Sequence, residues 1–226
     1  MEPAKRRATF EDLLSLPEEA RAEVLAGTIV TSPAPLPRHS RAQGALRRYI
    51  GGPFDDDDGF GGPGGWWILL EVDVRLGPHD VVRPDLAGWR RERLPVPWDV
   101  RPIDVRPDWV CEILSPTNAA TDRVTKRRLY ADHGVPFYWL VDPRERTLEA
   151  LRLEDRRWVE VGSYDDSAVA RIEPFGSDRA RSRPALPARR GRSGRKVGVR
   201  HSGPNRRGAT GCVYDGLGVN SSSRRS

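Results

Sequence analysis

A carboxylate in the middle of an apolar, strand-forming segment limits the folds open to this chain. The segment reads Trp109-Val110-Cys111-Glu112-Ile113-Leu114. Its alternation predicts a β-strand that places Val110, Glu112 and Leu114 on one face and the other residues on the opposite face. Burial of an ionised carboxylate without a partner costs several kcal/mol. The fold must therefore bring a partner of opposite charge to Glu112.

Two further charged residues belong to segments on either side of this strand. Asp85 follows Arg83-Pro84 and opens a strand-like segment, and Lys126 lies on the helix expected after Glu112. Two carboxylates about 4 Å apart repel by roughly 4 kcal/mol at an effective dielectric constant near 20, and a divalent cation between them would turn this repulsion into binding. Two carboxylates and one ammonium group are the minimum set for metal-assisted phosphodiester hydrolysis.

The ligand types favour one class of metal. Hard oxygen ligands favour Mg²⁺ or Mn²⁺ over zinc, and the sequence contains no Cys/His cluster with zinc spacing. Each residue also has an ordinary structural explanation. Glu112 could pair with an arginine at a strand edge, Asp85 could form a turn after proline, and Lys126 could be a solvated helix residue with Asp122 as its i,i+4 partner. The order of the three residues, rather than any one of them, favours a site.

The rest of residues 1–176 reads as short strands and helices. We predict helices over residues 10–16, 39–50 and about 118–133, and Gly134 ends the last of them. Strands are predicted over residues 23–30 as a hairpin, 66–76, from 85 onward, 109–114, 137–141, and 147–162 as a second hairpin. Residues 51–65, rich in Gly and Asp, are expected to form a mobile loop. This order predicts an α/β or α+β sheet domain.

The charge of the chain is unevenly distributed. The whole chain has a net charge of +6, but from Ser177 onward it has 13 Lys/Arg and 2 Asp/Glu, which leaves 25 basic and 30 acidic residues in 1–176. The overall charge is therefore no evidence for a DNA-binding face on the folded part. Residues 177–226 contain no Phe, Trp or Ile and show no periodicity. We predict a folded domain over 1–176 and a basic, disordered tail over 177–226.

Cysteine usage and hydropathy indicate a cytoplasmic protein. Cys111 and Cys212 lie in unlike surroundings, which argues against a disulfide framework. No apolar run reaches the roughly 18 residues that a membrane span needs. We expect no membrane association.

Several motifs together resemble the Uma-type restriction endonuclease family of the PD-(D/E)xK nuclease superfamily. They are Arg83-Pro84-Asp85, Glu112-Ile113-Leu114-Ser115-Pro116-Thr117, Asp122 with Lys126 and Tyr130, and the segment from Gly134 to Pro143. The similarity extends through residues 23–27 and 32–35 to His39, and covers roughly residues 8–175. The resemblance implies a restriction-endonuclease-like mixed central sheet flanked by helices.

The resemblance also implies an activity and its residues. It implies a Mg²⁺-dependent endonuclease that hydrolyses DNA, with Mn²⁺ as an alternative ion and a homodimer as a common state. Asp85, Glu112 and the carbonyl of Ile113 would hold the metal. In the superfamily pattern the lysine lies two residues after the second acid, but here that position is Leu114. The resemblance suggests that Lys126 takes over the lysine function.

Other residues have a weaker assignment. Glu23 and His39 match acidic and histidine positions near the site of the family, although each could be an ordinary strand or surface residue. Asp73 is a further acid to which we assign no role, and Tyr130 and Trp139 are expected in the core.

Two other functions are compatible with the sequence. The chain could be a non-catalytic nucleic-acid-binding module with a nuclease-like fold and an Arg-rich tail that contacts phosphates, or a scaffold that assembles partners through the tail. The tail departs from the family, which would continue after Phe175 with an apolar element. We interpret the tail as an altered end of the gene or a disordered extension.

Overall fold

The computed structural model describes residues 6–55, 63–165 and 171–175, all within one compact unit. The strands are β1 Ala22–Leu25, β2 Thr28–Thr31, β3 Trp66–Leu70, β4 Val74–Gly77, β5 Asp80–Val82, β6 Leu86–Arg90, β7 Trp109–Ile113, β8 Phe137–Asp142, β9 Thr147–Glu154 and β10 Arg157–Asp165. The helices are α1 Phe10–Leu14, α2 Pro37–Leu46, α3 Gly52–Phe54 and α4 Arg127–Asp132, with π-helical segments η1 Arg47–Gly51 and η2 Thr121–Lys126.

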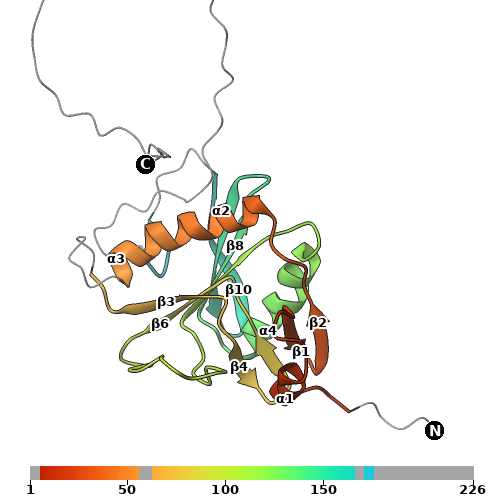
Figure 1. The fold of residues 1–226 in the computed structure, drawn as a ribbon. Helices are drawn as coiled ribbons and strands as arrows, with labels where there is room; N and C mark the ends of the chain where they lie inside the picture. Colours follow the sequence, from red (N-terminus) through yellow and green to blue (C-terminus); the bar gives the residue numbers. More distant parts are fainter. Residues whose placement is uncertain (1–5, 56–62, 166–170, 176–226) are drawn as a thin grey trace, which may run out of the picture. The chain divides into compact units, whose positions relative to one another are not determined.

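The strands form two sheets (Figure 1). The large sheet has the order β10-β9-β8-β7-β6-β3, and the small sheet has the order β2-β1-β5-β4. In the large sheet β7 and β8 are parallel and the other neighbours are antiparallel, so this sheet is mixed. The mixed α+β fold predicted from the sequence is therefore confirmed. The strand that contains Glu112 lies inside the sheet rather than at its edge.

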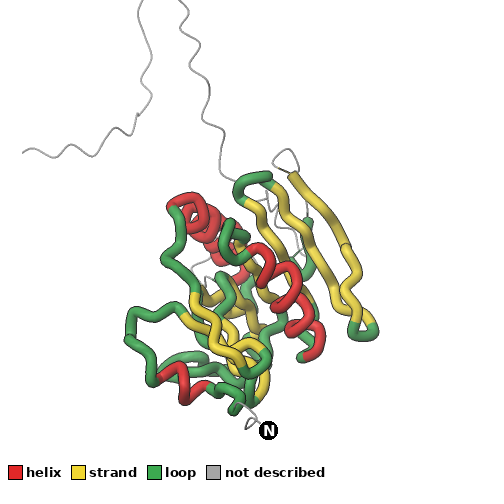
Figure 2. Tube along the Cα trace, turned by 90° about the vertical axis from the view of Figure 1, so that its right-hand side faces the viewer, coloured by secondary structure: helices red, strands yellow, loops and turns green. Residues whose placement is uncertain are grey.

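Helices cover both faces of the large sheet. Along α2, η1 and α3, buried residues including Ala42, Leu46 and Ile50 pack on one face against Trp109 and other residues of β7 and β8. On the other face, Leu129 and Tyr130 of α4 pack together with side chains from both sheets. The alternation predicted for β7 holds, because Val110 belongs to the second cluster and Trp109 to the first. Figure 2 shows the helices against the strands from the side.

Local signals account for the turns and helix ends. Ala26 and Gly27 have φ of 52° and 80° and join β1 to β2, the positive-φ pair that a two-residue hairpin turn requires. Gly134 has φ of 71° after α4, and the amide N–H groups of Gly134 and Val135 donate to the carbonyls of Ala131 and Tyr130. These are the two hydrogen bonds of a Schellman motif, which ends the helix where the sequence predicts.

The strand predicted over residues 66–76 is wrong as a single element. The chain breaks at Glu71, whose φ of 49° is in the left-handed region, so β3 belongs to the large sheet and β4 to the small one. Between β5 and β6 the chain passes back from the small sheet to the large sheet. Leu70 pairs with Leu86 and Val74 pairs with Val82. Residues 71–73 and 83–85 therefore lie opposite each other where two strands pass from one sheet to the other.

Three other expectations differ from the structure or lie partly outside the described residues. The loop predicted over residues 51–65 is wrong at its start, because helical structure continues through η1 and α3 to Phe54. Residues 56–62 lie outside the described residues, and so does the tail predicted over 177–226. The helix predicted over residues 10–16 ends at Leu14.

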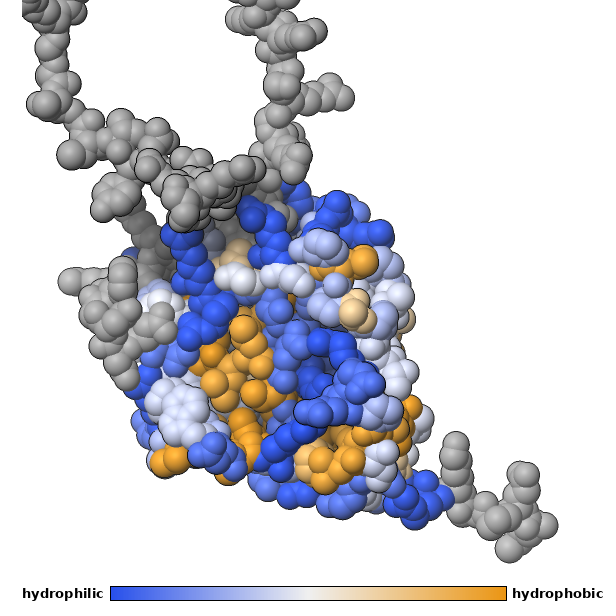
Figure 3. Space-filling view, viewed as in Figure 1, coloured by the Kyte–Doolittle hydropathy of each residue, from blue (hydrophilic) through white to orange (hydrophobic). Residues whose placement is uncertain are grey.

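The surface mixes charged and apolar side chains. In Figure 3 hydrophobic residues form separate patches among hydrophilic ones on the face shown. Large exposed hydrophobic side chains include Leu36, Trp98 and Val124. Among the helices that the structure describes, none is long and apolar enough to cross a bilayer.

Candidate active site

Asp85 is held at the point where the chain enters the large sheet. Its Oδ2 accepts a hydrogen bond of 2.6 Å from the backbone N–H of Ile113 on β7. Its Oδ1 lies 3.1 Å from Nε2 of His39, and the amide of Gln43 donates to its backbone carbonyl at 3.0 Å. His39 and Gln43 are four residues apart on α2 and therefore lie on the same helix face. The contacts fix Asp85 between α2 and β7 and leave it 9% exposed.

Glu112 points from the middle of β7 into a buried polar cluster, which it forms with Glu23, Asp122, Lys126 and Tyr130. Its Oε1 accepts hydrogen bonds from Nζ of Lys126 at 3.0 Å and from the hydroxyl of Tyr130 at 2.6 Å. The partner of this buried acid is a lysine, so the alternative of an arginine pair at a strand edge is wrong. Tyr130 lies in the core as expected, but its hydroxyl contacts the cluster.

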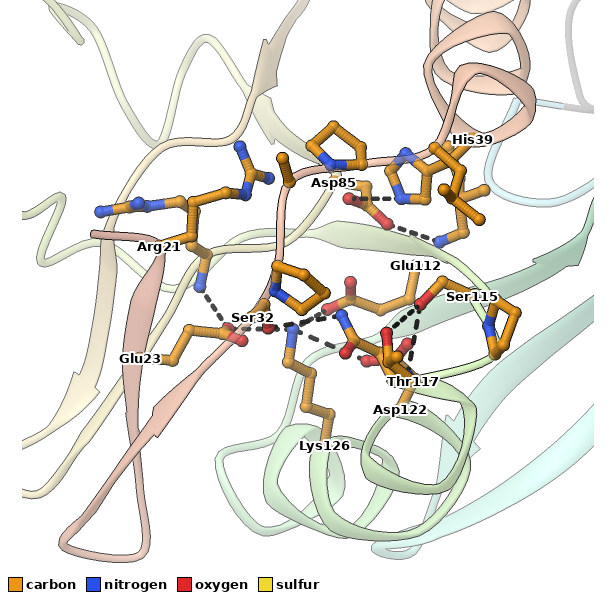
Figure 4. A pocket seen from close by; sticks show the side chains of 18 of the residues that line it. Arg21, Glu23, Ser32, His39, Asp85, Glu112, Ser115, Thr117, Asp122 and Lys126 are labelled. Carbon is orange, nitrogen blue, oxygen red and sulfur yellow. Dashed lines mark hydrogen bonds and ion pairs between the residues drawn. The ribbon is translucent and has the colours of Figure 1, made fainter. Parts of the chain in front are cut away.

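Lys126 lies at the centre of the cluster. Its Nζ is 2.9 Å from Oε1 of Glu23 and 3.7 Å from Oδ1 of Asp122, in addition to its bond with Glu112. Asp122, Lys126 and Tyr130 follow each other at four-residue spacing through η2 and α4, so these segments present all three side chains to the sheet. Lys126 is 4% exposed and is not a solvated helix residue. Figure 4 shows its bonds to the three acids.

The acids outnumber the lysine that they surround. Burial raises the pKa of Glu112 well above its usual range; Lys126 opposes this effect, and Asp122, Asp85 and Glu23 add to it. Burial likewise raises the pKa of Asp122 to about 7, against the attraction of Lys126. Burial alone would lower the pKa of Lys126, but Glu112, Glu23 and Asp122 raise it well above its usual value. The lysine therefore stays charged, and the carboxyl groups of Glu112 and Asp122 retain protons to higher pH than usual.

The cluster lies at a pocket of about 290 Å³. Glu23, Asp85, Glu112, Asp122 and Lys126 are among its lining residues, together with His39. One wall is the segment from Ser32 to Leu36, which follows β2, and another is the turn from Ser115 to Asn118, which follows β7. An Nδ2–Oγ hydrogen bond of 3.3 Å from Asn118 to Ser32 joins the two walls. The pocket also contains Arg21 and Arg83, so it combines acids, cations and apolar groups.

The chemistry of this pocket fits a hard divalent cation. Four carboxylates meet here with one buried lysine, and carboxylate oxygens are the ligands that Mg²⁺ and Mn²⁺ prefer. Within the described residues, no three His, Cys, Asp or Glu side chains are arranged as a ready set of metal ligands. The acids Glu23, Glu112 and Asp122 are arranged around Lys126 instead, and Asp85 is paired with His39.

The structure brings all the predicted site residues to one pocket. Asp85, Glu112, Ile113, Lys126, Glu23 and His39 all line it. His39 is 7% exposed and Glu23 is 8% exposed, so neither is an ordinary surface residue. The roles predicted for these residues, including metal binding by the carbonyl of Ile113, stay predictions. Asp73 does not line the pocket and pairs with Arg83 and Arg101.

Sequence reasoning did not assign several residues to the site. Asp122 stands out as the i,i+4 partner of Lys126 and as part of a family motif but received no site role, although the same spacing places it in the pocket. Arg21 and Gln43 carry no local signal, and Arg83 stands out only as part of the motif Arg83-Pro84-Asp85, because the contacts of these residues come from other segments of the chain. Trp139 lies in the core, as predicted.

Comparisons with known proteins identify the family of this chain. Residues 8–181 match the Uma2 family, which is described as "Putative restriction endonuclease". A search of the curated proteins gives no match. Among solved structures, a protein from Anabaena variabilis ATCC 29413, described as "a putative nuclease belonging to DUF820", is similar with a TM-score of 0.59 and 28% sequence identity; the match covers 75% of this chain and 92% of that one. The chain belongs to the Uma2 family and has a nuclease-like fold.

Proposed function

We propose that the protein is an endonuclease that hydrolyses phosphodiester bonds of DNA with Mg²⁺, which Mn²⁺ can replace. The observation that carries this proposal is the convergence of Glu23, Asp85, Glu112 and Asp122 at one pocket that contains a single lysine. Burial of several carboxylates close together is costly unless cations offset their charge. Family membership and the similar nuclease structure support the assignment.

Asp85 and Glu112 are the residues that would hold the ion, with the carbonyl of Ile113 as a further ligand. A divalent cation supplies Lewis-acid stabilisation of charge that develops on phosphate oxygens and makes an attacking water more acidic. The chain supplies orientation. Asp85 is fixed by the N–H of Ile113, and Glu112 is fixed by the hydroxyl of Tyr130, so neither carboxylate has to be ordered when substrate binds.

Lys126 supplies a positive charge at the same place. Its ammonium group lies within 3.0 Å of Glu112 and of Glu23. In the reaction that we propose, Lys126 orients the attacking water or stabilises the negative charge that develops in the transition state. His39 and Glu23 act as positioning residues, because the first contacts Asp85 and the second contacts Lys126.

The test is a cleavage assay on single-stranded and double-stranded DNA with Mg²⁺, Mn²⁺ or EDTA. We expect cleavage only with metal, and we expect Asp85→Ala and Glu112→Ala each to abolish it. Asp104→Ala is a matched control, because Asp104 is an exposed acid that pairs with Arg75 outside the pocket. This control should cleave as the unchanged protein does.

Two outcomes would contradict the proposal. Cleavage by the pure Asp85→Ala, Glu112→Ala double variant at the unchanged rate would place the activity elsewhere. Binding of DNA that neither metal nor these substitutions affects, without cleavage, would favour the non-catalytic binding module instead. Circular dichroism of each variant separates loss of activity from loss of fold.

A further inference from the structure

We propose that Arg21 binds a substrate phosphate at the mouth of the pocket, and that Glu71 is the positioning residue that orients its guanidinium group. This inference rests on the proposed function, because it assumes a phosphodiester at the acid cluster. The acid cluster consists of the four carboxylates that line the pocket, Glu23, Asp85, Glu112 and Asp122. It adds the residue that the cluster itself lacks, namely a cation with donors available to a polyanion.

The acid cluster cannot attract a phosphate by itself. Lys126 is the cation nearest to the acids, but its ammonium group is buried and already contacts Glu23, Glu112 and Asp122. A phosphate that approaches this arrangement is repelled by the surrounding carboxylates. A partly exposed cation in the pocket would offset this repulsion.

Arg21 is such a cation. It lines the pocket immediately before β1, and its side chain is 31% exposed. Its backbone carbonyl accepts from the N–H of Ser32 at 2.8 Å, which places it beside the wall that begins at Ser32. Glu71 is bonded to only one of its nitrogens, Nη1, at 2.7 Å. A guanidinium group has five N–H donors in a planar fork that matches two phosphate oxygens.

The other arginine of the pocket is less suited to this role. Both Nε and Nη2 of Arg83 lie 2.8 Å from Oδ1 of Asp73. The side chain of Arg83 is 18% exposed, less than that of Arg21. The backbone N–H of Arg83 donates to Glu23 at 2.6 Å. These contacts make Arg83 a structural link between the sheet-crossing segment and the acid cluster.

Glu71 combines an unfavourable backbone conformation with hydrogen bonds to two residues near the site. It stands at the break between β3 and β4 with φ of 49°, a conformation that is unfavourable for a residue with a side chain. Its two oxygens divide their bonds, Oε2 to Arg21 and Oε1 to Gln43 at 3.1 Å. Gln43 in turn donates to the carbonyl of Asp85. Glu71 thereby ties the proposed phosphate ligand to the backbone of a proposed metal ligand.

The experiment measures binding rather than cleavage, so that its result does not depend on activity. A fluorescent pentanucleotide is titrated against the full chain with Ca²⁺ in place of Mg²⁺, at several salt concentrations. The variants are Arg21→Ala, Arg21→Lys and Glu71→Gln. The matched control is Arg128→Ala, because Arg128 is an arginine with an 86% exposed side chain that does not line the pocket.

We expect Arg21→Ala to weaken binding about 10- to 100-fold, the size of a charge-assisted contact. The slope of log K against log salt should fall by about 0.7, because one phosphate contact to a single strand is lost. Arg21→Lys keeps the charge and should keep the slope while it loses part of the affinity. Glu71→Gln should weaken binding with little change in slope, because Arg21 stays charged but is less well oriented. Arg128→Ala should match the unchanged protein.

The inference is overturned if Arg21→Ala binds with the affinity and slope of Arg128→Ala, or if the unchanged protein does not bind the pentanucleotide. The proposed function fails separately. An unchanged protein that binds through Arg21 but does not cleave with Mg²⁺ or Mn²⁺ would support the phosphate contact and refute the nuclease.

Discussion

Asp122→Asn should make the metal-free protein more stable at neutral pH. The pKa of Asp122 is raised by burial from 3.8 to about 7, although Lys126 opposes the shift. A raised acid pKa means that the folded state holds a proton over a pH range in which the unfolded state has released it. Stability then falls as pH rises from about 4 to about 7 and changes little further above that range.

The magnitude follows from the size of the shift. About three pKa units at 1.36 kcal/mol each correspond to roughly 4 kcal/mol of lost stability for a side chain with 5% exposure. Asparagine does not titrate, so the stability difference between the variant and the unchanged protein should grow by about this amount between pH 4 and pH 7. The cause is burial of the carboxylate and, to a smaller extent, its repulsion by Asp85 and Glu23, which the uncharged amide avoids.

Urea unfolding with EDTA, followed by circular dichroism at half-unit steps of pH, measures this difference. Asp132→Asn is the matched control, because Asp132 is an acid on α4 with a 63% exposed side chain. A difference that stays constant from pH 4 to pH 7 would refute the reasoning, since Asp122 would then titrate alike in both states. Addition of Mg²⁺ should reduce the difference, because a cation offsets the same repulsion.

Three other substitutions test the packing of the site and its supports by urea unfolding at pH 7. Lys126→Met should lower the free energy of unfolding by about 3–5 kcal/mol, because it leaves buried acids without their cation. A loss below about 1 kcal/mol would mean that Lys126 does not stabilise these acids. Tyr130→Phe should cost about 1.5–3 kcal/mol through the lost bond to Glu112; an unchanged midpoint would mean that this bond contributes nothing. Gly134→Ala should cost about 1–2 kcal/mol at φ of 71°, whereas Val124→Ser, at a 68% exposed position, should stay within about 0.5 kcal/mol.

Sequence patterns correctly predicted the features that depend on neighbouring residues. The alternation around Glu112 predicted both the strand and its facing, because side chains of a strand alternate between two faces whatever the rest of the fold does. Gly134 predicted the end of α4, because it can adopt positive φ without strain. The four-residue spacing of Asp122 and Lys126 also indicated a pair. The family resemblance added the link between Asp85, Glu112 and Lys126, which lie in separate segments.

Contacts between distant segments were decided only by the tertiary structure. Arg21 and Glu71 are 50 residues apart, and Glu23 and Lys126 come from the small sheet and the π-helical segment η2. The residues from Trp66 to Leu76 alternate like one strand, but packing of two sheets forces a break at Glu71 that the local pattern does not encode. Local periodicity reports which face a side chain takes within its own element. The partner that it meets there depends on how the sheets cross, and that crossing is determined by the packing of the whole core.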